Sequence, residues 1–211
     1  MTQQSVKPQP TPGEAGFSRK TKTRERALST ASQILLRDGF ARLTMERVAA
    51  EAGVAKTTLY RRWPTKAALC MELYLDVAGR EVRDPDTGDI EHDLKRIAAT
   101  VVRLQTQTVA GPAFVGLIAE AQVNPETRAA FLAEFAHRRR EVTRRVLRRA
   151  IERGQLRADT DIDLVIDALG GAVTFRLLQG HAPLTAKFAH ALVTLVLSGC
   201  KTGSVVEKEH A

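Results

Sequence analysis

The fold is decided by residues 44–63, which read TMERVAAEAGVAKTTLYRRW. This stretch predicts two short helices joined by a tight turn. Thr44 is a residue type that caps helix N-termini, and Gly53 tolerates the positive φ that such a turn requires. Val54 and Leu59 are placed to form an apolar core shared by the two helices. The stretch therefore predicts a helix-turn-helix.

The second helix of this motif carries short polar residues at its start and cations further along. These residues are Lys56, Thr57, Thr58, Tyr60, Arg61 and Arg62. That arrangement fits the major groove of DNA, where donors and acceptors on base edges can be read. Trp63 is predicted to belong to the core rather than to the DNA contact.

The net positive charge of the chain comes from the part that contains this motif. The 211 residues carry a formal charge of +8, and residues 1–70 hold 13 basic against 5 acidic side chains. The remainder holds 19 of each, so the whole excess lies in the first third of the chain. This asymmetry indicates a basic module that meets a polyanion, joined to a neutral module with another task.

Composition bounds the remaining possibilities. With 44% hydrophobic residues the chain can bury a real core. It has no run of about 18 apolar residues and no signal-peptide pattern at its start, so we expect a cytoplasmic protein without a membrane contact. Cys70 and Cys200 are far apart in the sequence, which gives neither a metal-binding spacing nor a disulfide framework.

The chain reads as all-α almost throughout, because apolar residues recur at helical spacing and no hairpin pattern is present. The predicted organisation is a disordered arm over residues 1–19, a three-helix helix-turn-helix domain over residues 20–66, a larger helical regulatory and dimerisation domain over residues 67–200, and a tail over residues 201–211.

Several helix boundaries follow from breakers and caps. The first helix is predicted to begin near Thr23 and to end at Asp38, before a glycine. Gly111 and the proline after it are predicted to break a helix. Asn124, followed by a proline, is predicted to open the longest helix of the chain, which ends near residue 154.

Residues 48–54 (VAAEAGV) and 57–69 (TTLYRRWPTKAAL) resemble the TetR family of bacterial transcriptional repressors. The resemblance covers residues 20–80 strongly and the C-terminal part less strongly. It implies that Lys56 and Thr57 read bases, with Tyr60 and Arg61 within reach of bases or backbone. It further implies phosphate contacts from Thr44, Thr58, Tyr60, Arg62 and Lys66.

The resemblance also implies a homodimer that binds double-stranded operator DNA, is released from it by a small-molecule effector, and needs no cofactor. One recognition helix reads only one half-site, so two-fold symmetry is the expected solution. The last two helices are the candidate dimer interface, through Gly170, Gly171, Leu184, Phe188, Leu192 and Leu195. The same residues would also suit an intramolecular core.

An effector pocket is expected among the intervening helices, with Phe114, Ile118, Phe131, Phe135 and Arg139 as candidate lining residues. Aromatic residues at helical spacing equally suit a plain core. Arg139 falls on the apolar face of its helix, where an arginine needs a partner or an exit to water. It would pair with an internal acid such as Glu120, extend to solvent, or meet an anionic ligand.

Two further basic clusters are ambiguous. The side chains of Lys20, Lys22, Arg24 and Arg26 would reach a neighbouring phosphate or the minor groove, or would simply form a solvated face. The arginine-rich stretch over residues 138–153 is interpreted as a solvated outer face rather than a second nucleic-acid site, because acids elsewhere cancel its charge and no aromatic residues are interleaved.

The sequence disfavours two other classes of protein, an enzyme and a helical adaptor. An enzyme is disfavoured because the five histidines form no HExxH or similar pair, and no phosphate-binding or nucleophile-elbow motif is present. A helical adaptor that has lost DNA binding is disfavoured because the second helix of the motif keeps its polar and basic residues. No catalytic or metal site is predicted.

Overall fold

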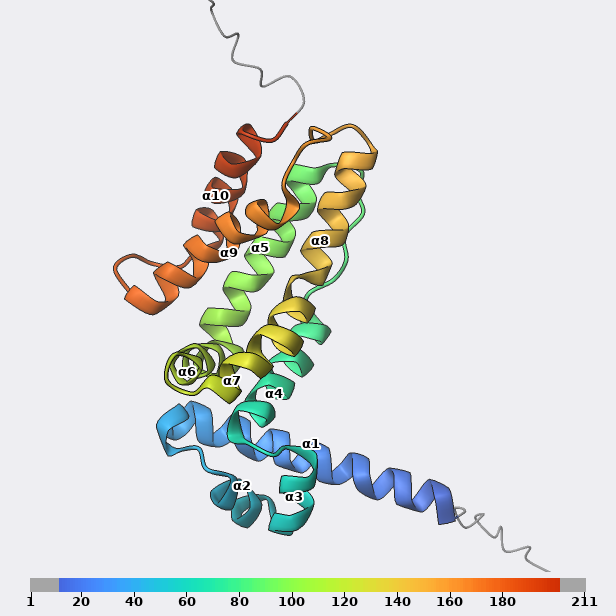
Figure 1. Ribbon diagram of the computed structural model, residues 1–211, viewed down its shortest axis with the longest axis vertical. Coiled ribbons are helices and arrows are strands. Elements are labelled where there is room, and N and C mark those ends of the chain that lie inside the picture. The colour runs from blue at the N-terminus through green and yellow to red at the C-terminus, as the bar shows by residue number, and fades with distance from the viewer. Residues whose placement is uncertain (1–11, 202–211) are drawn as a thin grey trace, which may run out of the picture. The chain divides into compact units, whose positions relative to one another are not determined.

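The computed structural model describes the backbone of residues 12–201 and, apart from Glu134, the side chains of residues 21–201 (Figure 1). The chain divides after Leu69 into two compact units, called here the N-terminal and the C-terminal unit. The described residues contain helices and no β-strand, which confirms the all-α fold class. None of these helices is both long and apolar enough to cross a membrane.

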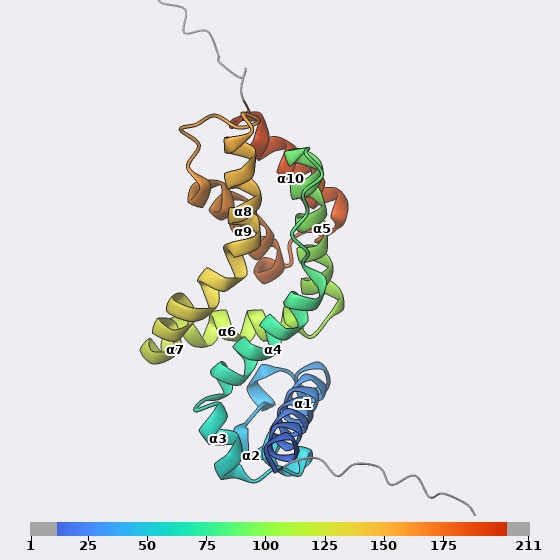
Figure 2. The same ribbon diagram turned by 90° about the vertical axis from the view of Figure 1, so that its right-hand side faces the viewer.

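The N-terminal unit consists of α1 (Pro12–Asp38), a 3-10 turn (Phe40–Arg42), α2 (Met45–Ala52), α3 (Lys56–Arg62) and the start of α4 (Lys66–Glu81). The inner face of α1 is apolar at helical spacing, and its buried side chains include Ala27, Leu28, Ala31, Ile34 and Leu35. Figure 2 shows α1 lying beside α2 and α3. A glycine at position 39 ends α1 with a φ of 78°.

The predicted arm is wrong from residue 12 to residue 19, because α1 begins at Pro12 rather than near Thr23. A proline suits the first position of a helix, where its missing N–H has no intrahelical partner. Good helix formers such as Glu14 and Ala15 follow it. The predicted arm over residues 1–11 and nearly all of the predicted tail lie outside the described residues.

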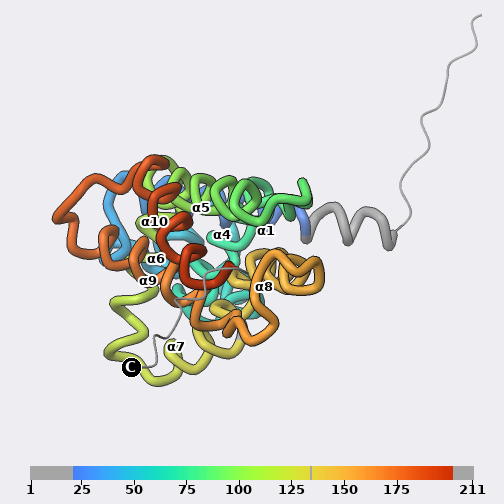
Figure 3. The backbone as a smooth tube through the Cα atoms, turned by 90° about the horizontal axis from the view of Figure 1, so that it is seen from above, coloured from blue at the N-terminus to red at the C-terminus, as the bar shows by residue number. Residues whose placement is uncertain are grey.

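The C-terminal unit continues through the following helices: α5 (Ile90–Gln107), α6 (Ala110–Val123), α7 (Pro125–Ala130), α8 (His137–Glu152), α9 (Ile162–Gln179) and α10 (Ala186–Ser198). Four of them, α5, α8, α9 and α10, gather around one apolar core (Figures 2 and 3). Leu94, Leu147 and Val193 are almost fully buried in it, and each such side chain stabilises the fold by about 1.5–3 kcal/mol.

Two boundary predictions in this unit are wrong. The helix that opens at Asn124 is not a single α-helix, because residues Phe131–Ala136 form a π-helical segment between α7 and α8. Gly111 and Pro112 do not break a helix but lie in the first turn of α6. Proline is tolerated there, and a Cβ on Gly111 would lie 2.0 Å from the carbonyl oxygen of Gln105, so the close approach requires glycine.

Several arginines of residues 138–153 bind acids, which adds ion pairs to the predicted solvated face, while Arg138 and Arg148 are exposed. Arg145 and Arg149 hold Asp84 in the loop before α5 at 2.9 and 2.7 Å, and Arg153 holds Asp86 at 2.5 Å. These partners lower the pKa of both aspartates, with Arg149 the main cause at Asp84 and Arg153 at Asp86. Toward α9, the ion pairs are Arg140–Asp167 at 2.7 Å and Arg144–Asp163 at 2.6 Å.

Candidate nucleic-acid interface and ligand cavity

The helix-turn-helix has the geometry that its sequence predicts. The hydroxyl oxygen of Thr44 caps α2 by accepting a hydrogen bond from the N–H of Arg47 at 3.2 Å. Gly53 then adopts a left-handed conformation with φ of 59°, and the N–H of Val54 returns to the carbonyl of Ala49 at 3.0 Å. This closes α2 in the manner of a glycine C-cap and turns the chain into α3.

The turn is further stabilised by Arg26, whose guanidinium donates hydrogen bonds to the carbonyls of Ala52 and Gly53. These carbonyls belong to the C-terminus of α2, where a cation is favoured by the helix dipole. A Cβ at Gly53 would lie 2.7 Å from the same guanidinium. The glycine therefore both permits the left-handed turn and leaves room for Arg26. Arg26 is exposed, as the solvated-face alternative predicts, and it also holds the turn, which neither alternative predicted.

Recognition helix α3 is anchored by its apolar residues. Leu59 is fully buried and Trp63 is 2% exposed, as predicted for core residues. The opposite side of α3 presents its polar residues to solvent: Lys56, Thr57, Tyr60, Arg61 and Arg62 are exposed, and Thr58 is half-buried. Six of the eight predicted DNA contacts therefore lie on one short helix whose orientation is fixed by the core.

The two remaining candidates, Thr44 and Lys66, begin the helices on either side of α3. Thr44 is exposed, and because its oxygen accepts the capping bond, its O–H remains a donor suited to a phosphate. The ammonium of Lys66 lies 4.5 Å from the centre of the Phe40 ring, a cation–π contact that holds the side chain beside the 3-10 turn.

Not every cation near the motif is available to DNA. The guanidinium of Arg47 binds Asp38 at 2.5 Å and Glu51 at 2.8 Å, and Arg37 binds the same two acids. The pKa of Asp38 is lowered, chiefly by its hydrogen bond from Arg37 and also by Arg47. This network joins the end of α1 to α2 and is structural.

Tyr60 has a partner that sequence reasoning missed. Its hydroxyl donates to the Oε1 of Glu46 on α2 at 2.6 Å. This hydrogen bond is the main cause of the raised pKa of Tyr60 and of the lowered pKa of Glu46. The residues are fourteen positions apart, on helices whose mutual angle the sequence does not specify, so no local pattern could have revealed the pair.

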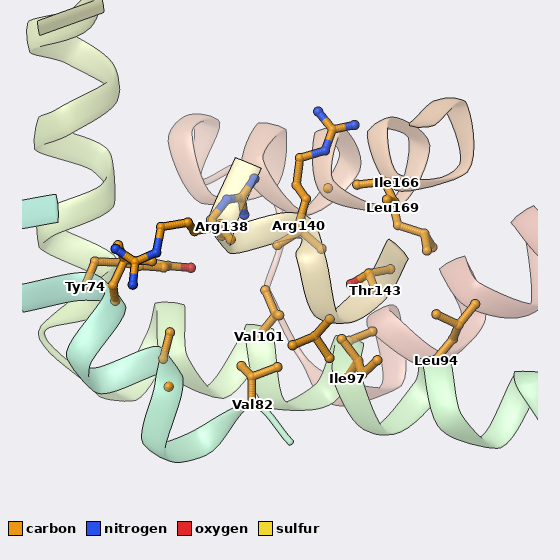
Figure 4. Close-up of a pocket in the computed structure, with 18 residues that line it drawn as sticks. Tyr74, Val82, Leu94, Ile97, Val101, Arg138, Arg140, Thr143, Ile166 and Leu169 are labelled. Carbon is orange, nitrogen blue, oxygen red and sulfur yellow. The ribbon is translucent and has the colours of Figure 1, made fainter. Parts of the chain in front are cut away.

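The C-terminal unit contains a cavity of about 270 Å³ between α4, α5, α8 and α9 (Figure 4). Most of its wall is aliphatic, including Val82, Leu94, Ile97, Val101, Ile166 and Leu169. Its polar lining is Tyr74, Thr143 and the three consecutive arginines at positions 138–140. In Figure 4 the guanidinium of Arg140 points away from the aliphatic wall, as its ion pair with Asp167 requires.

Of the predicted pocket residues, only Arg139 lines this cavity. Phe114 and Phe135 are buried, at 2% and 0% exposure, and pack with Phe131 and Tyr74 into an aromatic cluster with ring centres 5.0–6.5 Å apart. Ile118 is half-buried. None of the four predicted apolar residues lines this cavity, and Phe114 and Phe135 belong to the core, the alternative that their spacing left open.

Arg139 lies between this cluster and the cavity. Its guanidinium lies over the ring of Phe114, 4.8 Å from the centroid. Its Nε is buried and has no hydrogen-bond partner. Among the side chains that the structure describes, no carboxylate forms an ion pair with it, so Glu120 does not supply the partner that an internal arginine needs.

The candidate dimer face has both an inner and an outer side. On α10, Ala189, Val193 and Leu197 are buried in the core of the unit. The outer side stays apolar and exposed: Leu195 is 70% exposed, and Phe175 on α9 is 60% exposed. Of the other predicted interface residues, Gly171 is exposed and Gly170, Leu184, Phe188 and Leu192 are partly buried. Leu164 and Leu178 add exposed apolar surface on α9 that the prediction omitted.

Comparisons with known proteins agree with this geometry. A family model described as "Bacterial regulatory proteins, tetR family" matches residues 27–73, and one described as "Tetracyclin repressor-like, C-terminal domain" matches residues 84–196. The chain is 30% identical to the uncharacterized HTH-type transcriptional regulator YdeS of Bacillus subtilis, over 91% of this chain and 96% of that one. It is 34% identical to the DNA-binding transcriptional repressor TetR of Mycobacteroides abscessus, over 81% and 89%.

A solved structure gives the same result. The TetR family transcription regulator SCO0332 superposes with a TM-score of 0.74 and 38% identity, over 84% of this chain and 98% of that one. The two family models together span both units, and the resemblance inferred from the sequence is confirmed. The chain therefore belongs to the tetR family of bacterial regulatory proteins, which are DNA-binding transcriptional regulators and not enzymes.

Proposed function

We propose that the protein is a homodimeric repressor that works in the cytoplasm, binds a specific operator through α3 and is released from it by a small-molecule effector. The observation that carries the DNA-binding part is the exposure of Lys56, Thr57, Tyr60 and Arg61 around the buried Leu59. A helix fixed from behind can present side chains to base edges without losing much freedom on binding.

The chemistry of each side chain indicates whether it contacts bases or phosphates. Lys56 is placed to donate to guanine O6 or N7, and Thr57 to hydrogen-bond to a base or contact a thymine methyl group. Thr44, Thr58, Arg62 and Lys66 position the helix on phosphates, with Tyr60 shared between the two tasks. Arg26 and Arg47 are left out of the interface, because the fold already uses them.

The partner for the exposed apolar side of α9 and α10 is a second copy of the chain. Leu164, Phe175, Leu178 and Leu195 would otherwise leave large apolar groups in water. Two copies related by a two-fold axis would bring two recognition helices to successive major grooves, roughly 34–36 Å apart or a multiple of this. The name of the Mycobacteroides abscessus relative supports repression as the outcome.

Release by an effector is supported by the cavity, since α4 contributes both to its wall and to the N-terminal unit in which it begins. A ligand that binds one placement of α4 better than another shifts the equilibrium between them. In the placement that the ligand favours, the distance between the two recognition helices would no longer match the operator. The ligand then lowers DNA affinity, and DNA lowers ligand affinity by the same factor.

The deciding experiment is a salt titration of binding to the promoter fragment beside the protein's own gene, with a scrambled duplex of equal length as control. Specific binding should exceed binding to the scrambled duplex and weaken as salt rises, because phosphate contacts release counterions. Lys56→Ala combined with Tyr60→Ala should remove the preference. The proposal is wrong if no preference for the promoter is found, or if the double variant retains it.

A further inference from the structure

We propose that the cavity takes a small amphipathic organic anion, whose charged head is held by Arg139 and whose apolar body lies against the aliphatic wall. The inference rests on the proposed function, because it names the chemical class of the effector. It depends on three properties of the cavity, namely its charge, its lining and its size.

The charge of the lining has one sign. Three consecutive arginines, at positions 138–140, line the cavity and no acidic residue does. Arg140 is already neutralised by Asp163 and Asp167 on α9. The positive charge left to the cavity is therefore that of Arg138 and Arg139, and it favours an anion over a neutral or cationic molecule of the same shape.

Arg139 and Arg140 each have a buried Nε without a hydrogen-bond partner, and of the two only Arg139 forms no ion pair with a described carboxylate. Arg139 is partly buried, its Nε is shielded from solvent without an acceptor, and an aromatic ring covers one face of its guanidinium. Leaving a buried donor unpaired costs free energy, whereas a carboxylate would accept from it in a charge-assisted hydrogen bond. Gly170 on α9 lies beside this guanidinium, since a Cβ there would come within 4.0 Å of it.

The rest of the wall specifies the body of the ligand. Helices α4, α5, α8 and α9 supply the aliphatic side chains of Val82, Ile97, Val142 and Leu169, which favour a hydrocarbon over a sugar or nucleotide. A volume of about 270 Å³ lies just below the roughly 300–1,000 Å³ of ligand pockets. A single short alkyl or aryl group fits this description, and a large polycyclic molecule does not.

The test measures binding to the protein itself by isothermal titration calorimetry, without DNA, with octanoate as the anionic probe. Octanol and octylammonium, which carry the same chain with a neutral and a cationic head, are the matched controls. We expect octanoate to bind at least tenfold more tightly than either. Equal affinity for octanoate and octanol would overturn the assignment of a charged head, and absence of octanoate binding would overturn the inference.

Two variants test the place of binding. Arg139→Gln should weaken octanoate binding at least tenfold and leave octanol binding nearly unchanged, whereas Arg148→Gln, an exposed arginine of the same helix outside the cavity, should change neither. Gly79→Leu keeps Arg139 and adds a bulky side chain at a position that lines the cavity, where a Cβ meets no atom within 4 Å. It should abolish binding of both probes without lowering thermal stability; octanoate binding retained in Gly79→Leu would contradict the site.

Promoter binding measured with and without octanoate then separates the two proposals. If octanoate binds the wild type but not Arg139→Gln, and the promoter complex is unaffected, the ligand class stands and release by the effector fails. If the promoter is bound specifically and octanoate does not bind the protein, the operator-binding part stands and the present inference fails.

Discussion

At the scale of single residues, the recognition surface is modulated by one acid. Glu46 lies on α2 and accepts a hydrogen bond from the hydroxyl of Tyr60. It places a negative charge beside the helix that we propose approaches phosphates. The hydrogen bond holds the ring of Tyr60, which is 39% exposed, in one orientation. The acid therefore restrains an exposed aromatic side chain and weakens attraction to DNA of any sequence.

Glu46→Gln is accordingly expected to bind DNA more tightly but less selectively. Removing the negative charge raises affinity for every duplex by lowering electrostatic repulsion, and a gain of roughly threefold to tenfold is reasonable for one exposed charge near phosphates. Fluorescence anisotropy with the promoter fragment and with a scrambled duplex, at two salt concentrations, measures both effects.

Asp159→Asn is the matched control, because it also removes one exposed negative charge but lies in the C-terminal unit. Affinity should rise in Glu46→Gln and not in Asp159→Asn. Equal gains in both variants would mean that only the net charge of the chain matters, and unchanged affinity in Glu46→Gln would remove Glu46 from the interface.

The same scale shows what the sequence could predict. Thr44, Gly53 and Leu59 follow from local rules, because a cap, a left-handed turn and a buried helix position each depend on neighbours a few residues away. The roles of Arg26 and Arg47 do not, since each depends on acceptors brought close by the packing of α1 on α2. Charge counting alone assigned both arginines to the basic excess of the DNA-binding module.

At the scale of elements, the junction between α5 and α6 depends on a glycine. Gly111→Ala would place a Cβ 2.0 Å from the carbonyl oxygen of Gln105, and only a backbone shift can relieve this clash. We expect a loss of about 2–4 kcal/mol in the free energy of unfolding. Urea denaturation followed by circular dichroism gives the midpoint.

Gly79→Ala in α4 is the control for this prediction. A Cβ there meets no atom within 4 Å, so the substitution should stabilise the helix by about 0.5–1 kcal/mol. If both variants shift the urea midpoint in the same direction, the close approach of Gly111 to Gln105 is not the reason that position 111 requires glycine.

A second feature at the scale of elements is a polar cluster around Glu91, which joins the start of α5 to α10 and to the residue Lys201 that follows it. Glu91 accepts from Lys201 at 2.6 Å and from Thr194 on α10 at 2.8 Å, and it pairs with Lys95. These donors, Lys201 first, lower the pKa of Glu91 from 4.5 to about 2. A carboxylate whose pKa is lowered by folding stabilises the fold above its unfolded pKa, and this contribution is lost as the pH falls from about 4.5 toward 2.

Glu91→Gln should therefore be less stable than the wild type at pH 6, by less than about 1 kcal/mol because the cluster is partly open to solvent. The difference should shrink at pH 3. Urea midpoints at the two pH values and constant ionic strength measure it, with Glu152→Gln, an exposed carboxylate of α8, as control. A difference that is the same at both pH values would show that the charge of Glu91 is not responsible.

Helix boundaries are predicted correctly where apolar periodicity and capping residues agree. They are predicted wrongly where tertiary packing overrides these local signals. Asn124 caps the next helix with Pro125 in its first turn, as predicted. The π-helical segment at Phe131–Ala136 carries no local mark, because its residues are ordinary helix formers packed into an aromatic cluster. The predicted pocket residues are mostly phenylalanines, whereas the wall of the cavity is mostly aliphatic.

At the scale of the whole molecule, the sequence predicts two modules with different net charge and a boundary after residue 66. The structure divides into two compact units within α4, after Leu69. What the sequence could not specify is which apolar residues of the second module face inward. On α10 the pattern suits both a core and an interface, and only packing shows that Val193 is buried while Leu195 is not. Under the proposed function, the exposed apolar residues of α9 and α10 connect the second module to DNA binding by joining two copies of the chain.

The proposed dimer predicts a linkage between dimerisation and operator affinity. If the exposed face of α9 and α10 joins two copies, Leu195→Lys places two unpaired charges near the symmetric interface and should shift the protein to a monomer. Each monomer then contacts one half-site only, so promoter affinity should fall by two orders of magnitude or more while binding to scrambled DNA changes little. Light scattering after size exclusion gives the mass and anisotropy the affinity.

Val123→Lys is the matched control, since Val123 is an 82% exposed apolar residue of the same unit that lies outside α9 and α10. It adds the same charge and should leave both mass and affinity unchanged. A wild-type protein with the mass of a single chain would refute the dimer outright. If Leu195→Lys becomes monomeric yet retains full promoter affinity, one recognition helix suffices, and α9 and α10 have no part in reading the operator.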